Sequence, residues 1–308
     1  MSTPRLAVTV GDPRGIGPEI VAKLLRDGRA ARDATLVVVG PTGVDVEVAE
    51  RIGDWRADAP PALAGRLAGA AIERAVSMAT AGDVDGIVTA PIDKSVLLSG
   101  GYDYPGHTEM LAALTGARVA MMLTSAEGTA PHRSHGALRV VLATTHIALR
   151  DVPSAVTRER IVEIATITRS ALRDWFRVEK PRIALCALNP HAGDHGRFGD
   201  EDDQVFTPAA REARISGPFP ADTVFVRAIR GEFDAVIAPY HDVGMTAIKV
   251  AAFGRAVNVT LGLPFPRTSP DHGTALDIAG RGIADPSSMI EATLLCAAIA
   301  RHGASARA

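Results

Sequence analysis

Three segments of the sequence run from an apolar stretch through a short turn to a histidine. They are LRVVLATTH, PRIALCALNPH and DAVIAPYH, which end at His146, His191 and His241. Three imidazoles can hold one divalent cation and leave coordination positions open for substrate oxygens. The pattern therefore predicts a catalytic metal site, with ligands from one chain or from two subunits. The alternative is that each histidine only caps its strand or bonds a nearby carbonyl.

Asp242 follows His241 directly. A carboxylate at that position could orient an imidazole, act as a further metal ligand or take part in proton transfer. A surface salt bridge is the alternative without function.

Lys249, Asn258 and Arg267 form a second candidate group, suited to a phosphate. Arginine offers a planar pair of donors, lysine a point charge and asparagine an amide. Both charges lie in apolar sequence, TAIKVAAF and GLPFPRTS, where an unpaired charge would be unfavourable. Ordinary surface charge is the competing interpretation.

His107 and Thr108 open a predicted helix, Glu109–Leu114. Thr108 is either a plain N-cap or part of a site for an anion, because the N–H groups at a helix start point outward.

Two glycine-rich segments remain open between structure and function. GDPRGIGPE joins a predicted strand to a helix and is either a tight structural turn or a wall of the active site. HGTALDIAGRG, from His272 to Gly282, carries Asp277, whose carboxylate suits the hydroxyls of an adenosine ribose. Its glycines could equally just terminate elements. A third segment, Glu127–Gly136, is a predicted loop whose His132 and His135 we interpret as solvated.

Strands and helices alternate along the chain, which predicts an α/β fold with a mostly parallel sheet. The predicted strands are Leu6–Val10, Thr35–Gly40, Val84–Thr89, Val119–Thr124, Leu138–Ala143, Pro181–Leu188 and Ala235–Ala238. The predicted helices are Ile20–Leu25, Gly65–Ala81, Glu109–Leu114, Ser154–Trp175, Glu201–Arg214, Thr223–Arg230 and Pro286–Arg301.

Composition limits the classes of partner. With 308 residues, two domains are expected. A formal net charge of −2 predicts no binding to nucleic acid or to an anionic membrane surface. Cys186 and Cys296 lie in apolar runs without metal-ligand spacing, so we expect buried, reduced thiols in a cytoplasmic protein without a secretory leader.

Seven motifs, read together, resemble the 4-hydroxythreonine-4-phosphate dehydrogenase (PdxA) family from about Leu6 to the C-terminus. They are GDPRGIGPE, YPGHTE, TTHIALRDVP, LNPHAGDHGRFGDED, GPFPADTVF, YHD and FGRAVNVTLGLPFPRTSPDHGTALDIAGRG. HGTALDIAGRGIADP is also similar to the adenosine-binding loop of the isopropylmalate and isocitrate dehydrogenases.

The resemblance implies a fold and an assembly. It predicts two α/β/α domains with mostly parallel sheets, the first formed by residues 1–115 and 270–308 and the second by residues 116–269. The active site would lie in the cleft between them. It also implies a homodimer in which one zinc, magnesium or cobalt ion is bound by His146, His191 and His241 from both subunits.

The resemblance further assigns site residues. Substrate contacts fall on His107, Thr108, Lys249, Asn258 and Arg267. The adenosine of NAD, with NADP as the alternative cofactor, would be lined by His272, Gly273, Thr274 and Asp277.

The implied reaction is the NAD-dependent oxidation and decarboxylation of 4-phosphooxy-L-threonine to 3-amino-2-oxopropyl phosphate in pyridoxal phosphate biosynthesis. Asp242 and Lys249 are the candidates for receiving the hydroxyl proton. An acid at Asp277 favours NAD, since it would repel a 2′-phosphate.

Four departures from the family pattern leave the substrate open. Val243 replaces a glutamine, Met245 follows Gly244, Asp93 stands where an asparagine is expected, and the loop Glu127–Gly136 looks longer than usual. The alternative substrates are 4-phospho-D-threonate and 4-phospho-D-erythronate. A relative acting on cis-dihydrodiols fits less well, because the expected substrate contacts are retained. A phospho-hydroxy-acid binding protein without catalysis is the hypothesis from another class.

Overall fold

The computed structural model describes residues 3–125, 137–252 and 255–307. The predicted loop Glu127–Gly136, with His132 and His135, lies outside these residues. The chain divides into two compact units, Met1–Ala117 with Leu263–Ala308, and Arg118–Gly262. The domain boundaries expected from the sequence, after residues 115 and 269, stay a prediction.

The first unit contains a parallel sheet with the strand order β3-β2-β1-β4-β11. Its strands are β1 (Arg5–Thr9), β2 (Thr35–Thr42), β3 (Glu50–Asp54), β4 (Gly86–Thr89) and β11 (Arg267–Pro270). The central strands β1 and β4 are apolar and almost entirely buried, as expected when helices cover both faces of a parallel sheet.

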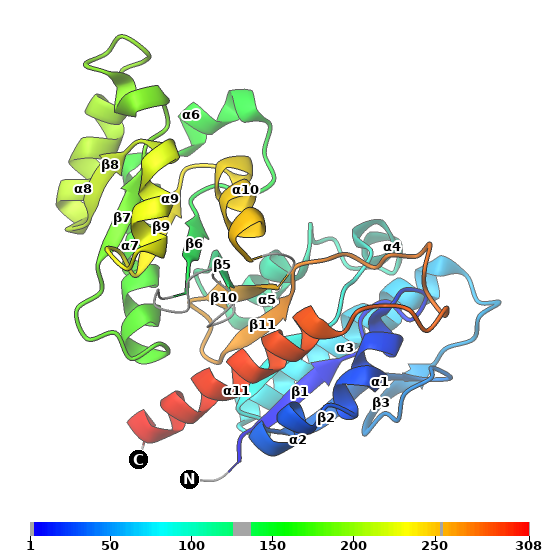
Figure 1. Ribbon diagram of the computed structural model, residues 1–308. Coiled ribbons are helices and arrows are strands. Elements are labelled where there is room, and N and C mark those ends of the chain that lie inside the picture. The colour runs from blue at the N-terminus through cyan, green and yellow to red at the C-terminus, as the bar shows by residue number, and fades with distance from the viewer. Residues whose placement is uncertain (1–2, 126–136, 253–254, 308) are drawn as a thin grey trace. The chain divides into compact units, whose positions relative to one another are not determined.

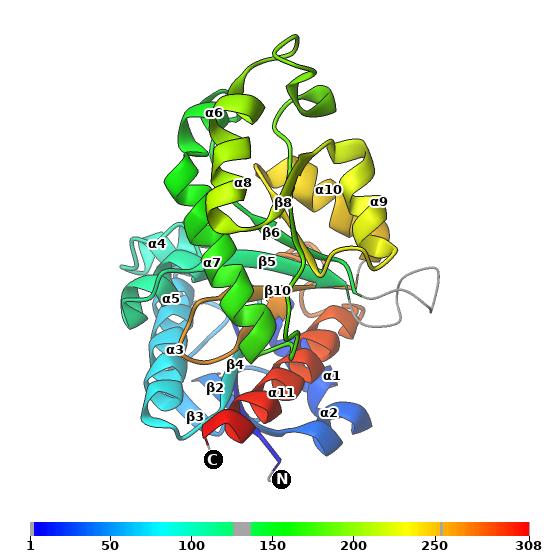
Figure 2. The same cartoon turned by 90° about the vertical axis from the view of Figure 1, so that its left-hand side faces the viewer.

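Helices cover both faces of this sheet. They are α1 (Gly17–Leu25), α2 (Gly28–Asp33), α3 (Pro61–Ala81), α4 (Lys94–Ser99), α5 (His107–Thr115) and α11 (Ser287–Arg307). Figures 1 and 2 show α3 on one face and α1, α2 and α11 on the other.

The second unit contains a mixed sheet with the order β10-β5-β6-β9-β7-β8, in which the four strands from β6 to β8 are parallel. Its strands are β5 (Ala120–Ser125), β6 (Arg139–Leu142), β7 (Ile183–Cys186), β8 (Ser216–Phe219), β9 (Ala235–Ala238) and β10 (Ala256–Leu261). The antiparallel pairs β10–β5 and β5–β6 occupy one side of the sheet.

Figure 2 shows α7 and α8 on one face of this sheet and α9 and α10 on the other. The helical segments are α6 (Val152–Ala155), α7 (Arg158–Asp174), α8 (Thr207–Ala213), α9 (Ala221–Ile229), α10 (His241–Ala252), the 3₁₀ segments η1 (Leu149–Asp151) and η2 (Pro190–Gly193), and the π segment η3 (Asp202–Phe206). The predicted α/β class with mostly parallel sheets is confirmed.

The long helix predicted over Ser154–Trp175 is wrong at its start. A short helix ends at Ala155, and Val156 has non-helical dihedral angles, φ −86° and ψ 71°. The main helix then begins at Arg158, where the Thr157 side chain accepts a hydrogen bond from Arg160 N. An N-cap threonine satisfies a free N–H group there and so restarts the helix.

Several elements were not predicted, and α10 matters most among them. Gly244, Met245, Ile248 and Ala252 are buried along it, which is helical spacing. Gly244 allows the close packing of this helix, because an added Cβ would lie 2.6 Å from Leu142 Cδ2.

The two cysteines are free and buried, as predicted. Across the described ranges, the structure contains no helix with the length and hydrophobicity required for a membrane span.

Candidate active site

His146 and His241 come together at one edge of the second unit's sheet. β6 and β9 are parallel neighbours with Leu142 paired to Ala238, so both strands deliver their following residues to the same edge. The two imidazole rings lie with their centroids 5.4 Å apart and their planes tilted by 46°. Both histidines of this pair therefore follow parallel strands at the same edge of the sheet.

His191 does not join the pair within one chain. It follows β7, the other neighbour of β9, but lies in a turn where His191, Ala192, Asp194 and His195 all have positive φ angles. Among the described residues, no three His, Cys, Asp or Glu side chains gather closely enough to hold a metal ion. A three-histidine site needs another source for its third imidazole.

Asp202 forms hydrogen bonds with the backbone at the start of the turn that carries His191. This carboxylate is fully buried and accepts hydrogen bonds from Leu188 N and Asn189 N, both at 2.9 Å. The neighbouring Phe198 is 47% exposed, and its ring centroid lies 6.3 Å from that of His191. The start of the turn is fixed by Asp202, and the His191 side chain is exposed to solvent.

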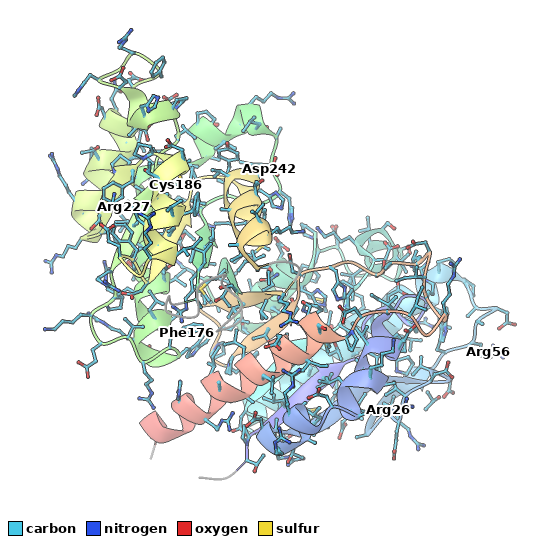
Figure 3. All side chains as sticks on the ribbon, in the orientation of Figure 1. Arg26, Arg56, Phe176, Cys186, Arg227 and Asp242 are labelled. Atoms are coloured by element: carbon cyan, nitrogen blue, oxygen red, sulfur yellow. The ribbon has the colours of Figure 1, made fainter. Side chains whose placement is uncertain are left out.

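Asp242 contacts its neighbour His241. The distance between His241 Nδ1 and Asp242 Oδ1 is 2.7 Å, and the carboxylate side chain is 84% exposed at the start of α10 (Figure 3). An ionised carboxylate only accepts, so the proton in this contact belongs to Nδ1. This arrangement leaves His241 Nε2 as the nitrogen able to bind a metal.

Val243 and Lys249 also lie on α10. Val243 packs against the apolar core of the second unit, so the side chain that replaces the expected glutamine contributes to packing. Lys249 is exposed, whereas its apolar sequence context had suggested burial. Asn258, on β10, has a buried Oδ1 without a hydrogen-bond partner among the described residues.

In the first unit, His107 and Thr108 form the first turn of α5. Gly106 is the N-cap, with no side-chain cap, so the N-cap interpretation of Thr108 is wrong. Glycine at the cap has no side-chain oxygen to accept from the first-turn N–H groups. These N–H groups can therefore bind an anion.

Arg267 is 1% exposed and donates from Nη2 to Thr89 Oγ1 at 2.6 Å. Burial lowers its pKa to about 10. His107 keeps some exposed surface, but its Nε2 is buried and has no hydrogen-bond partner within the described residues. Burial, and then the charges of Arg267 and Lys94, hold the pKa of His107 well below its usual value. A neutral imidazole thus lies near two cations.

Lys94 is a residue that the sequence reasoning left out. It opens α4, is exposed, and has an ammonium stem close to the start of α5: a Cβ added to Gly106 would lie 3.5 Å from Lys94 Cε. A positive charge next to the uncapped N-terminus of α5 suits an anionic ligand. A lysine in the turn after a buried parallel strand was the available sequence signal.

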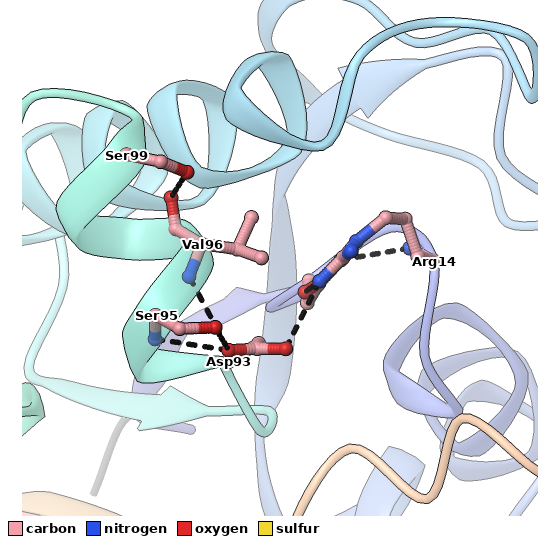
Figure 4. Close-up of polar contacts among 6 residues, drawn as sticks. Arg14, Asp93, Ser95, Val96 and Ser99 are labelled. Atoms are coloured by element: carbon pink, nitrogen blue, oxygen red, sulfur yellow. Dashed lines mark hydrogen bonds and ion pairs between the residues drawn. The ribbon is translucent and has the colours of Figure 1, made fainter.

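Asp93, the departure from the expected asparagine, has a structural role. Its carboxylate accepts from Ser95 N, Ser95 Oγ and Val96 N, and so caps α4 (Figure 4). Arg14 links it to the glycine-rich turn at 3.2 Å. The Ser95 hydrogen bond, which is the largest cause, and the further donors lower the pKa of Asp93 despite its partial burial.

The four residues expected to contact adenosine lie in the loop after β11. His272, Gly273 and Asp277 are exposed, and Thr274 is half-buried. A Cβ added to Gly273 would meet nothing within 4 Å, so the backbone there can be approached closely. An open backbone beside an exposed carboxylate fits the ribose of a dinucleotide.

A pocket of about 670 Å³ borders the same loop in the first unit. Its walls include Arg14, Glu19, Lys23, Trp55 and Gly282. None of the four expected adenosine contacts lines it; the residues of their loop that do are Ala279, Gly280 and Gly282. The volume is within the range of small-molecule sites.

Comparison with known proteins places these features in one family. A family model described as pyridoxal phosphate biosynthetic protein PdxA matches residues 21–296. A Bradyrhizobium diazoefficiens protein provisionally named D-threonate 4-phosphate dehydrogenase is 42% identical, with 95% of each chain covered. A Xanthomonas campestris 4-hydroxythreonine-4-phosphate dehydrogenase is 41% identical, with 96% of this chain and 98% of the relative covered.

The fold agrees with solved structures. The crystal structure of 4-hydroxythreonine-4-phosphate dehydrogenase from Klebsiella pneumoniae matches with a TM-score of 0.82 and 37% identity, covering 97% of this chain and 98% of the other. Isocitrate dehydrogenase from Methylococcus capsulatus matches with a TM-score of 0.56 and 17% identity, covering 99% and 88%. The predicted likeness to the isocitrate dehydrogenase fold is confirmed.

Proposed function

The chain belongs to the PdxA family, and from this premise we propose that it oxidises and decarboxylates 4-phosphooxy-L-threonine to 3-amino-2-oxopropyl phosphate. It is an oxidoreductase acting on a CH–OH group. The proposed electron acceptor is NAD, and the proposed setting is pyridoxal phosphate biosynthesis in the cytoplasm. The observation that carries the proposal is the contact between His146 and His241, with Asp242 fixing one of the two rings.

The proposed metal ligands are His146, His241 and His191 of the partner subunit in a homodimer. Two facts support the assignment of two ligands to one subunit and the third to its partner. The rings of His146 and His241 lie close together in one chain, and His191 lies on an exposed turn. A bound zinc, magnesium or cobalt ion would supply Lewis acidity toward the substrate's hydroxyl oxygen. Asp242 holds the proton on His241 Nδ1 and keeps Nε2 directed to the ligand position.

The substrate's phosphate is assigned to the positively charged group of the first unit. Arg267 and His107 offer buried donors, and the first turn of α5 adds N–H groups that include that of Thr108. Lys249 and Asn258 are the other residues proposed to contact the substrate. A phosphate held away from the reacting carbon fixes the orientation of the hydroxyl.

NAD is assigned to the loop of His272, Gly273, Thr274 and Asp277. The Asp277 carboxylate accepts hydrogen bonds from ribose hydroxyls and disfavours the 2′-phosphate of NADP. When bound, NAD supplies the hydride acceptor. Open glycine backbone at the loop supports this assignment.

Two residues are candidates for receiving the hydroxyl proton, Asp242 and Lys249. Variants Asp242→Asn and Lys249→Met separate them, because loss of a general base lowers kcat by about 10² to 10⁴. A change confined to KM would instead assign the residue to binding.

A second substrate, 4-phospho-D-threonate, is favoured by one observation. The relative with 42% identity carries the name D-threonate 4-phosphate dehydrogenase. 4-Phospho-D-erythronate is a diastereomer of that compound and shares its phosphate and secondary alcohol. Either compound would use the same residues and replace the biosynthetic reaction.

The deciding experiment is a substrate panel. Purified protein is given NAD and each of the three phosphorylated acids, and NADH formation is followed by absorbance with and without a chelator. NADH from 4-phosphooxy-L-threonine, lost on chelation and restored by metal, is the expected result. Activity that survives complete metal removal contradicts the metal assignment. Tight binding of all three acids without cofactor reduction would support a non-catalytic binding protein.

A further inference from the structure

Two side chains of helix α1 form hydrogen bonds with the C-terminal end of the loop that carries Asp277, at Gly282 and Ala284. Glu19 accepts hydrogen bonds from Ala284 N at 2.8 Å and from Gly282 N at 3.2 Å. Lys23, one turn later, donates to Ala284 O at 2.6 Å and to Gly282 O at 2.9 Å. The two side chains also form an ion pair at 2.8 Å. Four backbone groups of the loop are thus satisfied by one pair of side chains.

The near end of the same loop is attached to the turn before α1. Ile16 N donates to Thr274 O at 2.9 Å. Gly15 is required for this approach, because a Cβ added to it would lie 2.8 Å from Thr274 O. Both ends of the loop are therefore bonded to the segment GDPRGIGPE and to α1, which begins within that segment.

Between these attachments the loop makes turn hydrogen bonds of its own, from Ile278 N to Ala275 O at 3.1 Å and from Arg281 N to Ile278 O at 3.2 Å. No helix or strand is assigned to residues 271–286. Ala275, Gly280 and Gly282 have positive φ angles of 41°, 73° and 73°. A non-glycine residue in the left-handed region is unfavourable and persists only where surrounding contacts impose it. Hydrogen bonds from Ile16 N to Thr274 O and from Ile278 N to Ala275 O hold the backbone at this position.

We infer that Glu19 and Lys23 are positioning residues that set the geometry of the cofactor-binding loop. The inference rests on the proposed function, since it assumes that NAD binds this loop. The polar contacts of the pair are with each other and with the backbone of Gly282 and Ala284. It acts through Gly282 and Ala284 on the position of the Asp277 carboxylate.

The electrostatics of Glu19 agree with this role. Partial burial opposes its ionisation, but the Lys23 ammonium and the N–H groups of Ala284 and Gly282 outweigh burial and lower its pKa. Side-chain exposures of 14% for Glu19 and 30% for Lys23 leave the pair partly shielded from water. Charge-assisted hydrogen bonds to backbone groups are stronger than neutral ones.

The test compares Lys23→Met and Glu19→Gln with the wild-type protein. Each variant is expected to weaken NAD binding by about tenfold, since charge-assisted hydrogen bonds to the loop are lost. The Kd for NAD is measured by calorimetric titration, and KM is measured for NAD and for the phosphorylated substrate. Only the NAD constants are expected to change, with kcat and substrate KM within about twofold.

A second readout needs no cofactor. Hydrogen exchange of the Gly282 and Ala284 amides is expected to accelerate in both variants. Glu19→Gln removes the charge of the carboxylate that accepts from these amides, and Lys23→Met removes the ammonium group that holds this carboxylate. Arg74→Met is the matched control: it breaks another ion pair of the first unit, with Glu50, far along the chain from this loop. That control is expected to leave both the NAD Kd and the two amides unchanged.

Asp277→Ala, measured in parallel, separates the positioning role of Glu19 and Lys23 from the assignment of NAD to the loop. Weaker NAD binding in Asp277→Ala with unchanged NAD binding in Lys23→Met and Glu19→Gln overturns the positioning role alone. If neither Asp277→Ala nor the pair variants alter NAD binding, or the wild type binds no NAD, the cofactor assignment of the loop fails and the inference falls with it. Equal increases in NAD and substrate KM would indicate general destabilisation and also overturn the inference.

Discussion

The rings of His146 and His241 lie 5.4 Å apart although the two residues follow different strands. Their proximity follows from the parallel pairing of β6 with β9, because both turns leave the sheet at the same edge. His191 follows the next strand, β7, but does not complete a three-ligand group within the described residues of one chain.

His191→Ala is expected to lower kcat by at least about 100-fold, since a catalytic metal with one ligand missing binds weakly or in the wrong geometry. Far-UV circular dichroism is expected to stay unchanged because the side chain is exposed. Near-normal kcat would remove His191 from the ligand set.

Mixing subunits tests whether the site is shared. Neither His191→Ala nor His146→Ala should be active alone. In a mixed dimer, one of the two sites would have all its histidines, so random mixing should restore about a quarter of wild-type activity. No recovery after verified subunit exchange would contradict a site with His191 contributed by the partner.

Arg267→Ala is expected to raise KM for phosphorylated substrate by about 10- to 100-fold, because a buried charged donor to the phosphate is lost. Steady-state kinetics measure this, and a thermal melt accounts for the removal of a buried side chain. Arg32→Ala, an exposed arginine of the same unit, is the control. An unchanged substrate KM would exclude Arg267 from the phosphate site.

Lys94→Gln should weaken the same phosphate contact by a smaller factor, about threefold to tenfold, because its charge is exposed to water and salt. The difference from wild type should shrink as ionic strength rises. Lys180→Gln, also exposed, serves as the comparison. A loss of kcat without a change in KM would argue against a role in binding the phosphate.

His107 should make the protein less stable in acid. Its folded pKa is well below the unfolded value of about 6.5, so the unfolded chain binds more protons between the two values. The unfolding free energy therefore falls as pH drops through about 6.5, by up to about 1.4 kcal/mol per pH unit from this group. At higher pH the contribution is fully present.

Urea titrations of wild type and His107→Gln at several pH values between 5 and 8, about the range in which histidine titrates, measure this effect. The variant should show a shallower loss of stability below about pH 6.5. Identical slopes for the two proteins would show that His107 does not resist protonation.

Asp277→Asn is expected to raise the NADP-to-NAD ratio of kcat/KM by about tenfold, because it removes the charge that repels a 2′-phosphate. Both cofactors are compared at fixed substrate. Asp83→Asn, an exposed carboxylate elsewhere in the same unit, is the control. Wild-type preference for NADP would contradict the assigned role of the carboxylate.

The sequence by itself determined the α/β class, the strand-turn-histidine pattern and the family. These depend on local periodicity and on long motifs, which a reader can find without knowing any distance. Burial of Arg267 was also indicated, because its charge lies in apolar sequence.

Only the tertiary structure decided which side chains meet. The pairing of β6 with β9 brings His146 to His241, whereas His191 lies in a turn with positive φ angles and does not join them among the described residues, and neither follows from spacing along the chain. The exposure of Lys249 and the grip of Glu19 and Lys23 on Gly282 likewise depend on contacts between distant segments. Such contacts arise from packing and from the satisfaction of backbone polar groups, which local sequence patterns do not encode.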